Sequence, residues 1–259
     1  MMGDHRRGTV SMKRIVWLSF AVLLTLILRV PEARAIKDVD VALVLVTDVS
    51  RSIDDTEFKL EKEGYAAAFT DPRVIAAIQG GPNGAIAVAY VEFASAFEVM
   101  NVLDWTEIRD LASAQAFVDR LSAAPRSFWG RTAIGSGIDR GVQLLAESGF
   151  NTLRRVIDVC GDGTSNAGRD VAAARDDAVR AGITVNGLAI INENPAVWAT
   201  AHVQPPGGLV NYYREHVTGG PGSFVLEVRE FAKFGEAMTR KLVLEIAGTM
   251  PSTRFADRQ

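Results

Sequence analysis

Cysteine is almost absent from this chain: its 259 residues include one, Cys160. No intrachain disulfide can therefore form. Export without disulfides suits a bacterial periplasm, although other compartments are also compatible with it. Cys160 lies in a strand-like pattern, which is typical of a small buried hydrophobic residue; a reactive thiol is the less favoured interpretation.

The chain also lacks an excess of positive charge. It has 28 Lys and Arg against 31 Asp and Glu, a formal net charge of −3. The first 35 residues carry six of the basic and two of the acidic residues, so the charge without them is −7. A mildly acidic protein is a poor candidate for binding nucleic acid or an anionic membrane.

Several enzyme motifs are missing as well. No Gly-x-Ser-x-Gly elbow is present, which argues against an α/β-hydrolase. Gly135-x-Gly137 has the wrong spacing for a dinucleotide-binding loop and lies inside a predicted helix. A phosphotransferase of the haloacid dehalogenase type needs a second acid two residues after its aspartate, where this chain has Ser50. We identify no catalytic constellation and do not expect an enzyme.

One long apolar run is present, at residues 15–28, after a basic segment and before Ala33-Arg34-Ala35. This pattern predicts a cleavable signal peptide over residues 1–35. The alternative is a membrane anchor, but the run is shorter than the ~20 residues that a spanning helix needs. We therefore expect a periplasmic or secreted protein without a membrane span, comprising one domain over 36–250 and a flexible tail over 251–259.

Strand-like runs alternate with helical patterns in the remaining chain, which predicts a doubly wound α/β fold with helices on both faces of the sheet. The second and third strands are joined by a short link, so we expect them to be antiparallel at a sheet edge. The six predicted strands are 39–47, 85–93, 96–103, 153–160, 183–191 and 223–228. Helical patterns begin at Ser52 and cover 108–121, 133–148, 170–181 and 230–247.

The pentapeptide from Asp48 to Ser52 follows the first predicted strand directly. Ligands of doubly wound sheets bind beyond the carboxyl ends of the strands, where the strand order reverses. Asp48, Ser50 and Ser52 are therefore placed to bind a ligand at that edge. Taken alone, Ser50 and Ser52 are equally compatible with capping the next helix.

Two further segments place oxygen ligands at the same edge. Thr132 stands just before the glycine-rich helix, and Asp162 just after the fourth strand. Carboxylates and hydroxyls without histidine or cysteine define a site for a hard cation. Magnesium fits this set best, with Mn²⁺ or Ca²⁺ as alternatives. Asp48, Ser50, Ser52, Thr132 and Asp162 are called the five-residue set below.

In this order, the five-residue set resembles the metal-ion-dependent adhesion site of von Willebrand factor A domains. The resemblance covers residues 39–247. Gly161-Asp162-Gly163 with Asn166 and Gly168, together with the Tyr212–Glu215 segment, resembles a bacterial secreted subfamily of unassigned function.

The resemblance implies a role for each residue. Ser50, Ser52 and Thr132 would contact the metal directly, while Asp48 and Asp162 would often act through water. An acidic side chain of a partner protein would complete the coordination. Arg51 replaces the smaller residue that is usual at its position, and it is placed either to salt-bridge or to crowd an incoming ligand.

The segment 192–222 reads as a long loop, and such loops are often functional. Together with Arg51, its aromatic residues Trp198, Tyr212 and Tyr213 are candidates for a partner-binding surface. The alternative is that they fix the loop to the domain. His202 and His216 read as surface residues, and pairing either with Cys160 as a nucleophile is disfavoured.

The sequence therefore predicts an exported, metal-dependent protein-binding module of the adhesion or scaffold kind. Two alternatives remain open: a metal-dependent hydrolase, and a structural domain whose metal site is degenerate. A hydrolase requires a pocket that holds a general base near the metal, whereas an adhesion module presents a flatter, open face. Neither the partner nor the oligomeric state follows from the sequence.

Overall fold

The computed structural model describes residues 36–193 and 197–248 of the chain. The predicted signal peptide (1–35) and tail (251–259) lie outside these residues. Within the described ranges, no helix combines the length and apolar character that crossing a membrane requires.

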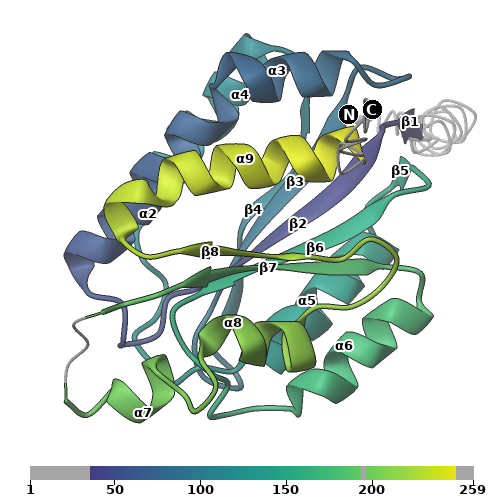
Figure 1. Ribbon diagram of the computed structural model, residues 1–259. Helices are drawn as coiled ribbons and strands as arrows, with labels where there is room; N and C mark the ends of the chain where they lie inside the picture. The colour runs from purple at the N-terminus through teal and green to yellow at the C-terminus, as the bar shows by residue number, and fades with distance from the viewer. Residues whose placement is uncertain (1–35, 194–196, 249–259) are drawn as a thin grey trace, which may run out of the picture. The chain divides into compact units, whose positions relative to one another are not determined.

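A six-stranded sheet forms the centre of the domain (Figure 1). Its strand order is β4-β3-β2-β6-β7-β8, and all neighbours are parallel except β3 and β4. The chain thus winds outward on both sides of β2, which confirms the predicted doubly wound fold with an antiparallel edge strand. The strands are β2 (Val41–Asp48), β3 (Ile86–Phe93), β4 (Val99–Ile108), β6 (Arg155–Gly161), β7 (Thr184–Ile190) and β8 (Val225–Val228).

Helices cover both faces of the sheet (Figure 1). Side chains of β2 alternate between two hydrophobic cores, with Leu43 in one and Val44 in the other. Burial on both faces explains why this strand is a continuous aliphatic run. One face carries α2 (Asp55–Phe69), α3 (Pro72–Gln79), α4 (Leu111–Ala123) and α9 (Phe234–Ala247); the other carries α5 (Ile134–Ala146), α6 (Val171–Arg180) and α8 (Leu209–Tyr212).

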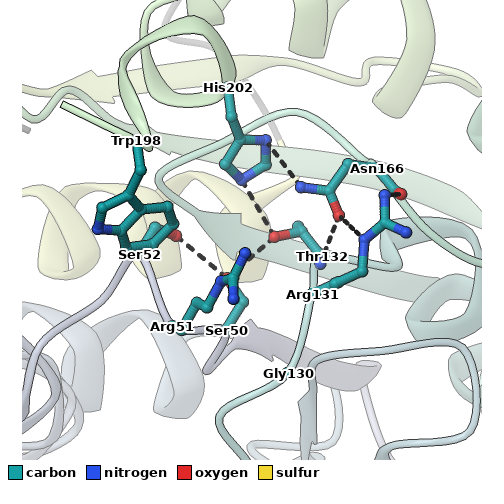
Figure 2. Close-up of a pocket in the computed structure, with 9 residues that line it drawn as sticks. All are labelled: Ser50, Arg51, Ser52, Gly130, Arg131, Thr132, Asn166, Trp198 and His202. Carbon is teal, nitrogen blue, oxygen red and sulfur yellow. Dashed lines mark hydrogen bonds between the residues drawn. The ribbon is translucent and has the colours of Figure 1, made fainter. Parts of the chain in front are cut away.

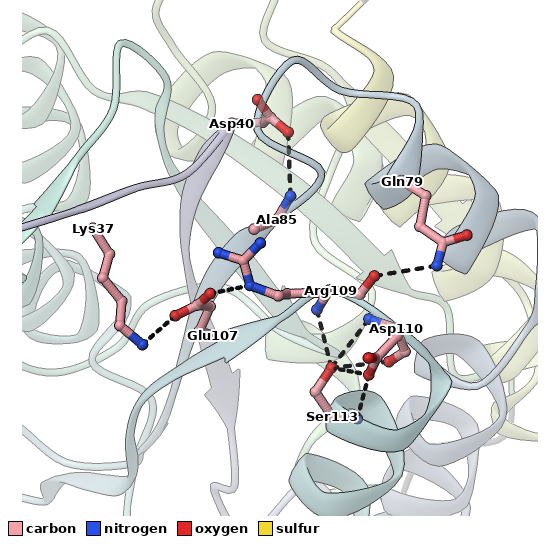
Figure 3. A network of polar contacts seen from close by, with 8 residues as sticks. All are labelled: Lys37, Asp40, Gln79, Ala85, Glu107, Arg109, Asp110 and Ser113. Atoms are coloured by element: carbon pink, nitrogen blue, oxygen red, sulfur yellow. Dashed lines mark hydrogen bonds and ion pairs between the residues drawn. The ribbon is translucent and has the colours of Figure 1, made fainter.

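The third strand is longer than predicted, because β4 continues to Ile108 and displaces the start of the next helix. Asp110 caps α4 by accepting a hydrogen bond from Ser113 N at 2.8 Å, and Ser113 Oγ accepts one from Asp110 N (Figure 3). Glu107 near the strand end pairs with both Lys37 and Arg109. Lys37 belongs to β1 (Lys37–Asp38), which pairs with β5 (Phe150–Asn151) in a separate small sheet.

Helix α2 begins later than the sequence pattern indicated. Its cap is Asp54, whose carboxylate accepts from Thr56 N and Glu57 N, while Glu57 Oε2 accepts from Asp54 N at 2.9 Å. This reciprocal capping box makes Asp54 the N-cap of α2, so the alternative in which Ser50 or Ser52 caps the helix is wrong. The Ser52 hydroxyl is thereby free for other contacts.

The segment 192–222 is not simply a loop. It contains α7 (Thr200–Val203), α8 and η1, a π-helix over Tyr213–Val217. Tyr213 is completely buried in the second core, where it packs against Gly187. The prediction of Tyr213 as a partner-binding residue is therefore wrong, because a side chain without exposed surface cannot contact a partner.

Two glycines of α5 allow the helix to pack closely against its neighbours. A Cβ at Gly137 would lie 2.7 Å from Val46 on β2. A Cβ at Gly135 would lie 2.5 Å from the carbonyl oxygen of Arg169, in the loop that follows β6. Bare backbone at these two positions lets the helix approach both the sheet and the loop that bears Asp162.

Candidate metal centre

The five-residue set converges at the carboxyl end of the central strands. Ser50 N donates to Asp48 Oδ1 at 2.8 Å, and this bond shapes the turn after β2. The Ser50 and Ser52 hydroxyls lie 3.1 Å apart. Thr132 Oγ1 donates to Ser50 Oγ at 2.9 Å, and Ser52 Oγ donates to Asp162 Oδ1 at 2.7 Å. Three segments distant in sequence thus present five oxygen-bearing side chains to one another.

The carboxylates of this set are buried and incompletely paired. Asp48 and Asp162 each have no exposed surface. No group within 36–193 or 197–248 donates a hydrogen bond to Asp48 Oδ2 or Asp162 Oδ2. Buried carboxylate oxygens without partners are costly unless a cation neutralises them, so the residues present fit a small divalent ion.

The electrostatics of the two acids support the same conclusion. Burial raises the pKa of Asp48 to about 7, against hydrogen bonds from Ser50 and the charge of Arg126. Burial also raises the pKa of Asp162 to about 8, and the neighbouring charge of Asp48 adds to this rise. The raised pKa values show that ionising both carboxyls in this buried site is unfavourable. A divalent cation beside them would stabilise both ionised forms.

Arg126 holds the loop between β2 and α2, a role that the sequence analysis missed. Its Nη2 donates to the carbonyl oxygens of Val49, Ser50 and Ile53 at 2.9, 2.8 and 2.9 Å. The guanidinium also lies 4.9 Å from the Trp129 ring centroid. Three carbonyls bound to one planar cation fix the path of the loop, and with it the direction of the serine hydroxyls.

Asn166 holds Thr132 in a similar way. Its Oδ1 accepts from Thr132 N at 3.0 Å and from Arg131 Nε at 3.3 Å. The carbonyl of Thr132 in turn accepts from Asn166 N at 2.8 Å. These two bonds between Thr132 and Asn166 join the start of α5 to the loop that carries Asp162.

A cavity of about 380 Å³ opens directly above the hydroxyls (Figure 2). Trp198 forms part of its wall and is 59% exposed. The guanidinium of Arg51 lies 4.8 Å from the Trp198 ring centroid. The cavity is lined by Ser50, Arg51, Ser52, Gly130, Arg131, Thr132, Asn166, Trp198 and His202.

His202 reaches the set from α7, and the sequence analysis did not place it there. Its Nε2 lies 3.1 Å from Thr132 Oγ1 (Figure 2). Its Nδ1 lies 3.1 Å from Thr164 Oγ1. Burial lowers the pKa of His202, which favours a neutral imidazole. No sequence spacing signals this contact, because it depends on the fold of the 192–222 segment.

The remaining predicted residues lie elsewhere. Tyr212 accepts a hydrogen bond from Ser165 N at 3.1 Å and lines a separate hollow with His216. Cys160 is fully buried, and its thiol contacts Glu61 at 3.4 Å. Cys160 therefore pairs with neither His202 nor His216, which excludes the nucleophile pair.

Comparisons with known proteins were made for the sequence and for the fold. A family model described as "Protein of unknown function (DUF1194)" matches residues 38–250. No curated protein sequence gives a significant match.

Solved structures with a similar fold include proximal thread matrix protein 1 from the mussel byssus, with a zinc-occupied MIDAS motif (18% identity, TM-score 0.55, 82% of this chain and 49% of that one). Others are a von Willebrand factor type A protein from Catenulispora acidiphila (15%, 0.54, 81% and 43%) and the von Willebrand factor domain of the type V pili tip protein Mfa5 from Porphyromonas gingivalis (12%, 0.55, 82% and 97%). The chain spans about half the length of the mussel protein. These likenesses establish a von Willebrand factor A fold.

Proposed function

The chain belongs to the DUF1194 family, a family of unknown function, and we propose that it is an exported protein-binding module that uses a divalent cation to engage its partner. The observation that carries the proposal is the pair of buried, unpartnered oxygens, Asp48 Oδ2 and Asp162 Oδ2, beside three hydroxyls. A divalent cation would stabilise the ionised form of such a set, which lies beneath a cavity that opens to the surface.

The hydroxyl and carboxylate residues of the site have different proposed roles. Ser50, Ser52 and Thr132 would hold the ion through their hydroxyl oxygens, while Asp48 and Asp162 balance its charge. When bound, the ion supplies a positive charge that an acidic side chain of a partner can approach. The mussel protein with a zinc-occupied MIDAS motif supports a divalent ion in this fold.

Arg51 and Trp198 belong to the proposed recognition surface. Both are exposed, and both line the cavity above the hydroxyls. Stacking on Trp198 holds the Arg51 guanidinium at the cavity wall, where it adds positive charge for an acidic ligand. Tyr212 is half-buried and lines its own hollow, so it would contribute at the margin of a larger interface.

Export of the protein is part of the proposal. The basic and apolar pattern of residues 1–35 supports a signal peptide, and removal of this segment would release the domain into the periplasm or the medium. The pilus tip protein from Porphyromonas gingivalis supports an extracytoplasmic setting for the fold.

Thermal unfolding with and without added divalent metal tests the metal dependence. A ligand that binds the native state alone raises the melting temperature as its concentration rises. We expect such a rise with Mg²⁺ or Zn²⁺ in the wild-type protein and none with Asp48→Ala. Partner capture from the exporting compartment should likewise be lost on chelation and in that variant. An equal melting-temperature rise in Asp48→Ala would contradict the proposed site.

One observation favours a second candidate function, metal-assisted hydrolysis. His202 places a neutral imidazole in the cavity beside Thr132, where a general base would be needed. Metal-loaded protein incubated with chromogenic ester, phosphoester and peptide substrates tests this alternative. Turnover that disappears in His202→Ala would support hydrolysis, whereas absence of turnover by the metal-loaded protein would leave the binding function.

A further inference from the structure

The imidazole of His202 is fixed in place by the fold around it. Ala199 and Val203, on either side of it in the α7 segment, are 2% and 1% exposed and anchor the segment to the domain. The carbonyl oxygen of His202 accepts a hydrogen bond from Thr164 N at 3.1 Å. This bond attaches His202 to the loop that carries Asp162. Together with the buried residues Ala199 and Val203, it fixes the position of the imidazole ring.

The residue after Asp162 makes room for this ring. A Cβ at Gly163 would overlap the imidazole of His202. Any larger residue would push the ring away from the hydroxyl of Thr132. Gly163 thus permits the close approach of the His202 ring.

The distances within the site match those between ligands of one ion. Metal–ligand bonds of about 2.0–2.1 Å place adjacent ligand atoms about 2.9 Å apart in an octahedral site and about 3.3 Å apart in a tetrahedral one. The separations of Asp162 Oδ1 from Ser52 Oγ, and of Ser52 Oγ from Ser50 Oγ, are 2.7 and 3.1 Å. Thr132 Oγ1 follows at 2.9 Å from Ser50 Oγ, and His202 Nε2 continues the series at 3.1 Å.

The far side of the ring has the partner that a metal-binding histidine requires. Nδ1 lies 3.1 Å from Thr164 Oγ1, a hydroxyl that can accept a hydrogen bond, and 3.4 Å from Asn166 Nδ2. With its proton on Nδ1 and donated to Thr164, the ring presents the Nε2 lone pair toward the hydroxyls. Metal-binding histidines are commonly oriented in this way by a hydrogen bond from the second nitrogen.

We propose that His202 is a ligand of the metal, and that the site selects a transition-metal dication of the zinc class over Mg²⁺. The inference rests on the metal site of the proposed function and specifies its ion. Magnesium prefers oxygen ligands and retains several waters, whereas an imidazole nitrogen suits zinc and its neighbours. A histidine that binds the metal is also unavailable as a general base, which removes the basis for hydrolysis.

NMR of ¹⁵N-histidine-labelled protein, prepared without a histidine tag, tests the assignment directly. The chain contains three histidines, so the ring signals are few. We expect Zn²⁺ to shift the Nε2 signal of His202 and to leave that of His216 in place. His216 is a suitable reference because it packs against Tyr212, in the separate hollow.

Metal titrations of matched variants give the second readout. We expect His202→Ala and His202→Gln to weaken Zn²⁺ binding at least tenfold, while Mg²⁺ binding changes less than threefold. Loss of a group that only orients a metal ligand lowers metal affinity about 10–100-fold. Removal of a ligand itself should therefore lower the affinity at least tenfold. His216→Ala is the control and should bind both ions like the wild type.

These experiments distinguish failure of the His202 assignment from failure of the proposed metal site. An unmoved His202 signal in zinc-saturated protein would overturn the ligand assignment, and Asp48→Ala losing all metal binding would still support the site. Equal metal binding by Asp48→Ala and wild type would overturn both. The NMR measurement uses the wild-type protein, so it decides the question even where a variant fails to fold.

Discussion

Thr132 Oγ1 donates a 2.9 Å hydrogen bond to Ser50 Oγ across 82 residues of sequence. Both residues are 1% exposed, so the bond is shielded from water. It joins the end of β2 to the start of α5, the two segments between which the cavity opens. The hydroxyl of Thr132 is therefore expected to serve both the alignment of the site and the binding of the ion.

Thr132→Val tests this double role, because valine keeps the shape and removes the hydroxyl. We expect metal affinity to fall at least tenfold, and loss of the buried bond to cost about 1–2 kcal/mol of stability. Thermal unfolding across a metal titration measures both effects. Thr106→Val on β4 is the control and should respond to metal like the wild type; a full response in Thr132→Val would contradict the role.

Arg126→Lys tests the support of the loop between β2 and α2. Lysine keeps the charge but lacks the planar guanidinium, which donates to these three carbonyls through Nη2 and to the Phe128 carbonyl oxygen through Nε at 3.0 Å. We expect a loss of about 2–4 kcal/mol, since hydrogen bonds from charged groups contribute about 1.5–3 kcal/mol each and lysine recovers part of this. Urea unfolding measures the loss, and Arg120→Lys on exposed α4 is the matched control. A stability equal to that of the control would show that the three bonds are dispensable.

The sequence predicted the five-residue set because topology alone brings its members together. Asp48 ends β2, Asp162 directly follows the neighbouring strand β6, and Thr132 lies just before α5. Parallel strands present their carboxyl ends at one edge, so position in the chain nearly determines position in space. The antiparallel edge strand was predicted on a different ground, the short link between the second and third strands.

The sequence did not predict Arg126 or His202, for a physical reason. Both act through contacts that depend on the path of irregular segments, and neither has a fixed spacing from the residues it touches. Tyr213 was misplaced for the same reason: its aromatic ring suggested a surface anchor, but η1 turns it into the core. Periodicity locates helices and strands, whereas it carries no information on how a long connection folds back.

Gly135→Ala tests the packing of α5 against the loop that carries Asp162. In an open helix this change would stabilise by about 0.8–1 kcal/mol. Here the new Cβ would lie 2.5 Å from the Arg169 carbonyl oxygen, which is backbone and cannot rotate away. We therefore expect a net loss of about 1–3 kcal/mol in urea unfolding. Gln143→Ala, on the exposed side of the same helix, should be near neutral; a stabilised Gly135→Ala would refute the clash.

Three charged side chains, from β6 and α9, form a buried cluster. Lys241 Nζ lies 2.7 Å from Asp158 Oδ1 and 2.5 Å from Glu245 Oε1, and all three side chains are fully buried. One ammonium faces two carboxyls, an arrangement that favours the protonated form of Asp158. Burial raises the pKa of Asp158 to about 7, the charge of Glu245 adds to the rise, and Lys241 opposes it.

The sign of the pH dependence follows from this raised pKa. The ordinary pKa of aspartate is 3.8, so between about pH 4 and 7 the folded protein holds a proton that the unfolded chain has released. Stability from this group is therefore complete at low pH and falls by about 1.4 kcal/mol per pH unit across that window. Above pH 7 the contribution is constant.

Asp158→Asn removes the titrating group while keeping its shape. We expect its unfolding free energy to decline with pH less steeply than that of the wild type between pH 5 and 7, by the equivalent of one proton. Urea unfolding in chelator at pH 5, 6, 7 and 8 measures the slope, and exposed Asp119→Asn should retain the wild-type slope. The acids of the metal centre are present in every protein compared, so the difference isolates Asp158. An unchanged slope in Asp158→Asn would place the retained proton on another group of the cluster.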